Sequence, residues 1–291
     1  MPGFDGLRVP ADADIWHMVQ SFIKPMSAGA ICPRDREIGC AYVDTLRSKD
    51  DAGKATALLS YAWGHKFAEV IAALETWTVS TGCNPKRTYF WVCSFCLNQH
   101  GINGLPRGDN IDPSDPRAAA RLAKGFYDRI VGIGRILPML EPWDSPGYVK
   151  RAWCLFELYT AVTKRLKVEI ILSASETARF RQAIQTRGYG VVDTVLDGID
   201  GALATSTHPE ELALVRKEVL GHPGGMPMLN ETVKMKLREW FQSQGGIRVA
   251  RRRSSMAMLG GPSATSRQAP QQQFGLEPSL LSHTGIDESG V

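Results

Sequence analysis

The sequence has no run of about 18 apolar residues, the length that a helix needs to cross a membrane. Its first residues, MPGFDGLRVPADAD, have neither the basic start nor the apolar stretch of a signal peptide. The formal net charge of +4 is small for 291 residues, so no domain-wide basic face predicts binding to nucleic acid. We therefore expect a cytoplasmic protein whose partners include neither a membrane nor a nucleic acid.

The cysteines lack the pattern of a disulfide framework, because several of them lie inside apolar runs as small buried residues do. Cys93 and Cys96, with His100, resemble half of a zinc site. A second pair at matching spacing is missing, although Cys83 could be recruited. Cys93 and Cys96 are also predicted to lie in a strand, where residues three apart point to opposite faces. We therefore expect no metal site.

Composition divides the chain into three regions. Residues 1–50 mix short apolar pieces with prolines and charges, and we expect them to pack one or two short helices on the main domain. Residues 51–245 carry the hydrophobic patterns of a folded domain. With 43% hydrophobic residues, the chain can build a core that needs neither a disulfide nor a metal.

Residues 246–291 are of low complexity and poor in large apolar side chains, so we expect a disordered tail. The stretch RRRSS at 251–255 is of the kind that a basophilic kinase modifies, which makes Ser254 and Ser255 candidate phosphorylation sites. The alternative interpretation is a solvated tail without such a role.

Short apolar runs alternate with helical patterns through the main domain. Such alternation indicates βαβ units and hence an α/β fold with a parallel sheet and helices on both faces. A long loop is expected at 101–116, and Ser173 with Glu176 forms a capping-box pattern at the start of a further helix. The predicted strands are 55–61, 89–97, 133–140 and 167–172, and the main predicted helices are 65–80, 117–130, 149–163, 209–220 and 230–243.

The predicted helix at 149–163 contains the stretch AWCLFELYTAV at 152–162, in which Glu157 is the one charged side chain. This stretch is apolar on nearly every face, so it must be covered on both sides. A carboxylate in such a place is paired, protonated or part of a cleft, because an unpaired buried charge is too costly. The structural alternative is a salt bridge from Glu157 to Arg151 or Lys150, or a contact at the helix N-terminus.

Three motifs, in order along residues 54–172, resemble two related families: Toll/interleukin-1 receptor (TIR) domains and heterokaryon-incompatibility (HET) domains. LLSYAWG at 58–64 resembles the LSYxWG opening of HET domains and the FxSYRG strand of TIR domains. YFWVCSFCLNQH at 89–100 resembles the WIDxxCINQ segment of HET domains. RAWCLFEL at 151–158 resembles both the SRWCLDEL helix of plant-type TIR domains and the RxWTxQE helix of HET domains.

The resemblance implies a flavodoxin-like sheet with a ligand cleft at the carboxyl ends of its strands. In TIR domains that are enzymes, the glutamate of the WCLDEL helix cleaves NAD at the nicotinamide glycosidic bond, and Glu157 takes that place here. A carboxylate suits this reaction, because loss of nicotinamide leaves an oxocarbenium-like ribose that it stabilises or captures. NAD would be a substrate and not a permanently bound cofactor. The other residues expected to bind it are Ser60, Tyr61, Trp63, His65 and Trp153.

Two departures weaken the prediction of catalysis more than that of the fold. Cys93 stands where HET domains have an acid, and His65 and Lys66 stand where TIR domains usually have one. Two alternatives therefore stay open. The chain can be a non-catalytic module of the same fold that self-associates in innate-immunity or cell-death signalling, or an unrelated flavodoxin-like domain. Core packing is likewise the alternative to ligand stacking for Tyr61 and Trp63.

Overall fold

The computed structural model describes residue 10 and residues 12–48, 50–101, 118–206, 209–221 and 224–244. The predicted tail at 246–291, with Ser254 and Ser255, and all but the first residue of the predicted loop at 101–116 lie outside these ranges. Within them, no helix combines the length and the apolar character that crossing a bilayer requires.

Four parallel strands form one sheet in the order β2-β1-β3-β4. The strands are β1 (Ala57–Ser60), β2 (Phe90–Trp91), β3 (Arg135–Pro138) and β4 (Lys167–Val168). All four residues of β1 are buried, as expected for a parallel strand that is covered on both faces. The sequence prediction of an α/β, flavodoxin-like parallel sheet is confirmed.

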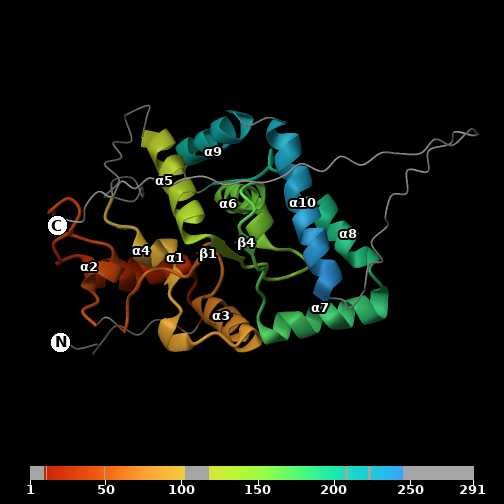
Figure 1. The fold of residues 1–291 in the computed structure, drawn as a ribbon, viewed down its shortest axis with the longest axis horizontal. Coiled ribbons are helices and arrows are strands. Elements are labelled where there is room, and N and C mark those ends of the chain that lie inside the picture. Colours follow the sequence, from red (N-terminus) through yellow and green to blue (C-terminus); the bar gives the residue numbers. More distant parts are fainter. Residues whose placement is uncertain are drawn as a thin grey trace, which may run out of the picture. The chain divides into compact units, whose positions relative to one another are not determined.

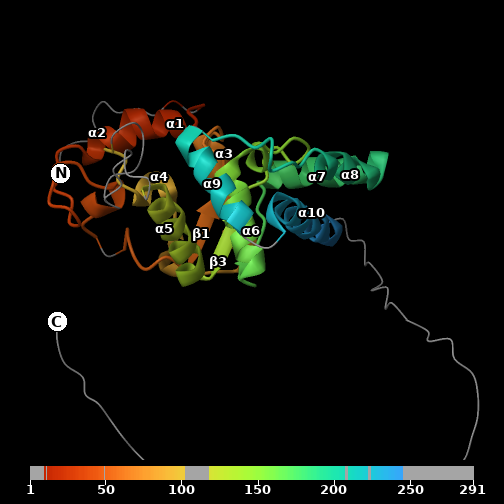
Figure 2. The same ribbon diagram turned by 90° about the horizontal axis from the view of Figure 1, so that it is seen from above.

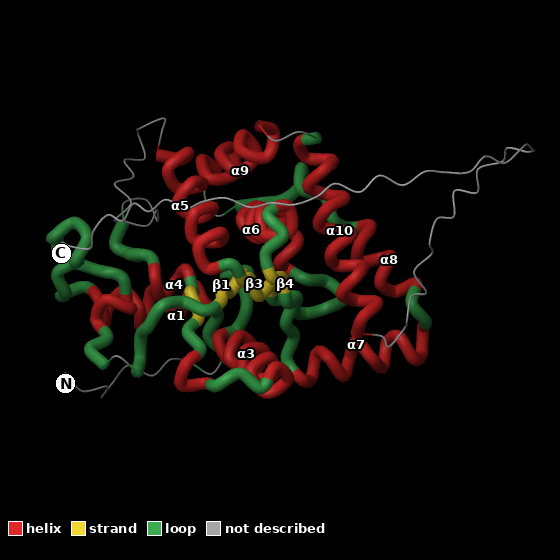
Figure 3. The backbone as a smooth tube through the Cα atoms, in the orientation of Figure 1, coloured by secondary structure: helices red, strands yellow, loops and turns green. Residues whose placement is uncertain are grey.

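Helix α3 (Phe67–Thr81) covers one face of the sheet, and α5 (Ala118–Ile133) and α6 (Ala152–Thr163) cover the other (Figure 1, Figure 3). Side chains alternate along β1, so neighbouring residues serve opposite faces. Leu59 lies in the hydrophobic cluster formed with α3, whereas Leu58 lies in the cluster formed with α5 and α6. The sheet is therefore the middle layer of three.

Four more helices follow β4: α7 (Ala174–Arg187), α8 (Gly190–Asp197), α9 (Pro209–Gly221) and α10 (Gly225–Gln244). Helices α9 and α10 both contact α6, so α6 lies between them and the sheet. The sequence patterns predicted α7, α9 and α10, whereas the eight-residue α8 went unpredicted. Aromatic rings, among them Phe180 of α7 and Phe241 of α10 at 5.2 Å, join these helices.

The N-terminal segment forms one helical run made of α1 (Ile15–Met18), a π-helical turn at Val19–Ile23 and α2 (Lys24–Ser27) (Figure 2). Apolar side chains of this run lie in the same cluster as β1 and α3. Its start also crosses the loop after β1, where Ile15 N donates to His65 O at 3.1 Å. The segment is therefore packed against the carboxyl end of β1.

The predicted strand at 89–97 is wrong beyond its first residues. Strand β2 ends at Trp91, and the chain then makes one helical turn, α4 (Cys93–Cys96), in which Cys96 N donates to Val92 O at 2.8 Å. Tertiary contacts prevail here over the β-propensity of these residues. The helical turn brings Ser94 Oγ within 2.8 Å of Tyr61 Oη. The expectation that Cys93 and Cys96 point to opposite faces is therefore wrong as well, since residues three apart on a helix are neighbours. No set of three potential metal ligands gathers among the residues that the structure describes.

The predicted capping box at the start of α7 is half correct. Ser173 is the N-cap, and its side chain accepts a hydrogen bond from Glu176 N at 3.3 Å. The Glu176 carboxylate does not return this bond to Ser173, because it accepts instead from Trp143 N at 3.0 Å. Ser173 N donates to the buried carboxylate of Glu141. The reciprocal bond was thus replaced by contacts with the loop after β3.

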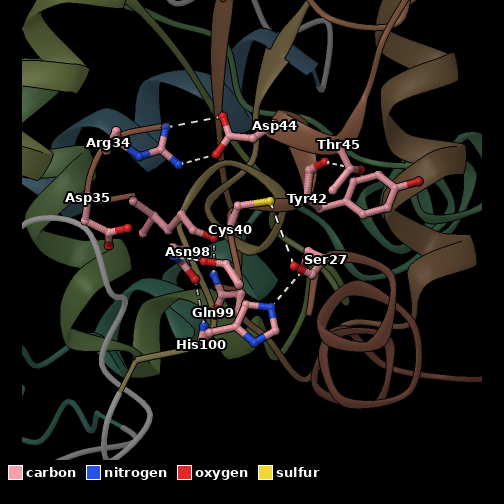
Figure 4. Close-up of polar contacts among 12 residues, drawn as sticks. Ser27, Arg34, Asp35, Cys40, Tyr42, Asp44, Thr45, Asn98, Gln99 and His100 are labelled. Atoms are coloured by element: carbon pink, nitrogen blue, oxygen red, sulfur yellow. Dashed lines mark hydrogen bonds and ion pairs between the residues drawn. The ribbon is translucent and has the colours of Figure 1, made fainter. Parts of the chain in front are cut away.

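Polar contacts join the N-terminal segment to the residues that follow α4 (Figure 4). Asn98 Nδ2 donates to Gly39 O at 2.9 Å, and Asn98 Oδ1 accepts from His100 N at 2.9 Å. His100 Nε2 lies 2.8 Å from Ser27 Oγ. Gly39 has a φ of +88°, and a Cβ built there would lie 2.9 Å from Cγ of His100. The NQH end of the second motif is thus an anchor for residues 27–39.

We expect Gly39→Ala to lower the free energy of unfolding by about 2 kcal/mol, since alanine resists positive φ and its methyl group meets the His100 ring. Gly82→Ala is the matched control, because Gly82 also has a positive φ, +62°, but no atom within 4 Å of the added Cβ. It should cost about 1 kcal/mol. Urea denaturation of both variants checks this, and equal losses would show that the approach to His100 contributes nothing.

Candidate functional site

Helix α6 holds Glu157 in a fully covered position. The helix begins at Ala152, after a 3₁₀ turn at Gly147–Lys150, and so starts three residues later than predicted. Glu157 is 7% exposed and lies among a run of buried residues that extends from Cys154 to Ala161. The prediction of a helix covered on both sides is confirmed, because the sheet lies on one side and α9 and α10 on the other.

The structure brings two of the predicted site residues into direct contact. Ser60, the last residue of β1, donates a hydrogen bond through Oγ to Oε2 of Glu157. Ser60 Oγ also lies 2.8 Å from Oη of Tyr148, and Tyr148 Oη donates to Cys154 O at 2.9 Å. The expected alternative of a salt bridge to Arg151 or Lys150 does not occur among the described residues, where Ser60 is the polar partner of this carboxylate.

Burial sets the protonation of Glu157. It raises the pKa of this carboxyl group to about 7, and the hydrogen bond from Ser60 opposes the rise only in part. Two neighbouring thiols respond to the same environment. Burial, with the nearby Glu157 carboxylate adding to it, raises the pKa of Cys93 to about 11 and that of Cys154 well above its usual value. Near neutral pH, Glu157 therefore populates both of its protonation states.

The number of hydrogens in the cluster favours the neutral form of Glu157 in this closed arrangement. The cluster has three contacts: Glu157 to Ser60, Ser60 to Tyr148, and Tyr148 to the Cys154 carbonyl. Each hydroxyl group supplies one hydrogen, and an ionised carboxylate supplies none. With Glu157 ionised, the 2.8 Å contact between Ser60 and Tyr148 therefore lacks a hydrogen. If Glu157 is protonated, it can donate to Ser60 Oγ in place of accepting from it, and the Ser60 hydrogen is then free for Tyr148, so the neutral form can supply a hydrogen to all three contacts.

Tyr61 and Trp63 lie beside this cluster, at the junction of the loop after β1 with α4. Tyr61 is 5% exposed, and Trp63 Nε1 donates to Cys93 Sγ at 3.4 Å. Trp63 also packs against Trp16 of α1, with ring centroids 6.0 Å apart. In this structure, therefore, Tyr61 packs in the core and the N-terminal segment covers part of Trp63.

His65 connects the loop after β1 to the loop after β3 through a hydrogen bond. It is 5% exposed, and its Nε2 donates to Glu141 O at 2.8 Å. Its Nδ1 has no hydrogen-bond partner in the described part of the chain, and burial lowers the pKa of the ring. The carboxyl ends of β1 and β3 border the place where open α/β sheets bind ligands. This contact therefore joins the two loops at the edge of the sheet where such a site is expected.

Trp153 lies one turn before Glu157 and packs toward α5. Its ring centroid is 4.8 Å from that of Phe126 and 6.0 Å from that of Phe156. A cavity of about 590 Å³ exists elsewhere, beside β2, and neither Trp153 nor Glu157 lines it. Because Glu157 is only 7% exposed, a ligand can reach it only if neighbouring residues move.

Sequence reasoning missed three residues of this site: Tyr148, Cys154 and Glu141. Glu141 accepts a hydrogen bond from Ser173 N, and burial raises the pKa of its carboxyl group. A buried acid directly after a predicted strand was a signal that could have indicated it. Tyr148 had no such signal, because its role depends on where the turn before α6 places its hydroxyl group.

No family model matches the chain, and no curated protein or solved structure matches it. The fold and the site define an α/β domain with a buried serine, tyrosine and glutamate cluster at the carboxyl edge of a parallel sheet. The likeness to TIR and HET domains is therefore carried by the three sequence motifs alone.

Proposed function

We propose that this chain is a TIR- and HET-like signalling domain that hydrolyses NAD at the nicotinamide glycosidic bond, with Glu157 as its catalytic carboxylate. The contact between Ser60 and Glu157 carries the proposal. The two residues belong to different motifs, lie 97 positions apart, and meet at the edge of the sheet where α/β folds bind ligands. No basic side chain neutralises Glu157 among the contacts that the structure describes.

The chemistry needs the ionised form of Glu157. The bond between the ribose C1′ and the nicotinamide nitrogen breaks, nicotinamide leaves with the electron pair, and positive charge develops on the ribose. A carboxylate beside C1′ stabilises that charge, and water then adds to C1′ and releases one proton. A pKa of about 7 leaves a large ionised fraction at neutral pH.

The closed structure is then the resting form. Substrate reaches Glu157 only after the contact between His65 and Glu141 opens and Ser60 turns from Glu157 toward a ribose or phosphate oxygen. Opening removes Glu157 from its apolar surroundings and favours ionisation. We propose that self-association of the domain drives this change.

A non-catalytic module that works by homotypic assembly is the second candidate. The observation that favours it is the burial of Glu157, which is 7% exposed, together with the hydrogen bond between His65 and Glu141 that joins the loops after β1 and β3. In that case the Ser60, Tyr148 and Glu157 cluster is a structural element of the core.

One experiment distinguishes the enzyme from the interaction module. The purified full chain is incubated with NAD, and the release of nicotinamide is followed by chromatography. We expect release whose rate rises more than linearly with protein concentration, because assembly opens the site. Complete absence of release at concentrations where light scattering shows assembly would reject the enzyme and favour the interaction module.

A further inference from the structure

The cavity of about 590 Å³ lies beside β2, on the edge of the sheet that no strand covers in the described residues. It is lined by β2 with the residues before it, and by residues within 42–46 and 50–55. Helix α3 contributes Phe67, Val70 and Leu74. The volume falls within the range of small-molecule sites, and the cavity lacks every residue of the Ser60, Tyr148 and Glu157 cluster.

Aromatic rings form much of this cavity. Tyr42 and Phe95 meet edge to face with centroids 5.5 Å apart, and Phe67 lies 6.4 Å from Phe95. Tyr89 and Phe90 line the β2 side. These rings offer flat apolar surfaces, and the face of an aromatic ring attracts cations.

The described residues that line the cavity carry more negative than positive charge. Among the described residues that line it, Arg34 is the one basic side chain, and both of its terminal nitrogens bind the carboxylate of Asp44 (Figure 4). Asp50 and Asp51 also line the cavity, are exposed, and have no ion pair in the part of the chain that the structure describes. Burial and the nearby Asp51 carboxylate together raise the pKa of Tyr42, which keeps its hydroxyl group neutral. An anionic ligand would meet repulsion here.

The edge strand adds a hydrogen-bonding peptide unit. Strand β2 pairs with β1 through Tyr89 O, which accepts from Ala57 N at 3.4 Å. Peptide groups alternate in direction along a parallel strand, so N–H and C=O of Phe90 point away from β1. Phe90 is also one of the residues that line the cavity.

We propose that this cavity binds a small organic cation with a flat apolar body. The ammonium group would lie between the Asp50 and Asp51 carboxylates, and the body would insert between Tyr42 and Phe90. NAD, with its two phosphate groups, has the wrong charge for this place, so the proposal is independent of the reaction proposed at Glu157.

Three probes of one shape test the charge preference: naphthylethylammonium, the neutral naphthylethanol and the anionic naphthylacetate. Calorimetric titration of the full chain should show the cation binding about tenfold more tightly than the alcohol, and the anion more weakly than the alcohol. Equal affinities for cation and anion, or no binding of any probe in the millimolar range, would overturn the proposal.

Two variants locate the binding. The double variant Asp50→Asn with Asp51→Asn should weaken the cation about tenfold and leave the alcohol unchanged. The control, Glu37→Gln with Glu75→Gln, removes the same two charges at exposed positions outside the cavity and should leave both affinities unchanged. If the control weakens the cation as much as the double variant does, the effect is one of net charge and the proposed site is wrong. In a further variant, Ala55→Leu should fill the cavity and weaken both ligands.

Discussion

Glu157→Gln is expected to lower the rate of nicotinamide release from NAD about a thousandfold, since it removes the negative charge that stabilises the ribose cation. Glutamine matches the shape of glutamate, so the buried helix α6 should keep its packing. Glu157→Ala should lose as much activity, but it also leaves a void in the core. Chromatographic assay of nicotinamide, with far-UV circular dichroism to check folding, measures both.

The matched control is Glu75→Gln, which removes one exposed carboxylate from α3, away from the cluster. It should keep the wild-type rate. Ser60→Ala should fall between the two, because Ser60 positions Glu157 but carries no charge. If both Glu157 variants still release nicotinamide at the wild-type rate, Glu157 has no role in the reaction. The fold assignment does not depend on this result.

The same glutamine substitution is expected to stabilise the protein, relative to wild type, by about 3.5 kcal/mol more at alkaline pH than at acid pH. The pKa of Glu157 is raised from 4.5 to about 7 in the folded chain, so folding favours the protonated form. Wild-type stability is therefore full below pH 4.5, falls as the pH rises through about 7, and then levels off. At about 1.4 kcal/mol for each pKa unit, the interval of about 2.5 units gives the expected difference.

Urea denaturation of wild type and Glu157→Gln at a series of pH values tests this. Other buried groups change stability in both chains and cancel in the difference. Glu141, whose pKa is also raised, destabilises as pH rises, whereas His65, whose pKa is lowered, destabilises as pH falls below its unfolded value. A difference that does not depend on pH would contradict the burial of an ionisable Glu157.

Local patterns were enough to predict the parallel sheet and the helix that carries Glu157. The apolar run before Ser60 and the apolar faces around Glu157 both require cover on two sides, and each of these requirements can be seen within about ten residues. To predict that Ser60 and Glu157 lie close together, one further rule was needed: ligand sites lie at the carboxyl edge of such a sheet.

Other features depended on contacts that local sequence does not encode. Residues 93–96 have a strand-like composition, but the hydrogen bond between Ser94 and Tyr61 favours a helical turn there. Tyr148 enters the site from a 3₁₀ turn, and the direction of its side chain follows from the packing of α6 and not from any spacing. The cavity beside β2 could not be predicted for the same reason, since its lining residues come from at least five separate segments of the chain.

The raised pKa of the Cys154 thiol beside Glu157 has a practical consequence. Thiolates react with alkylating reagents and thiols do not, so the raised pKa of Cys154 and its burial, 4% exposed, together keep it unreactive. Cys93 differs, because it is partly exposed. A movement that admits a substrate to Glu157 should also expose the Cys154 thiol to solvent. The rate at which iodoacetamide modifies Cys154, measured by mass spectrometry of peptides, should therefore report how often the domain opens in the absence of any substrate.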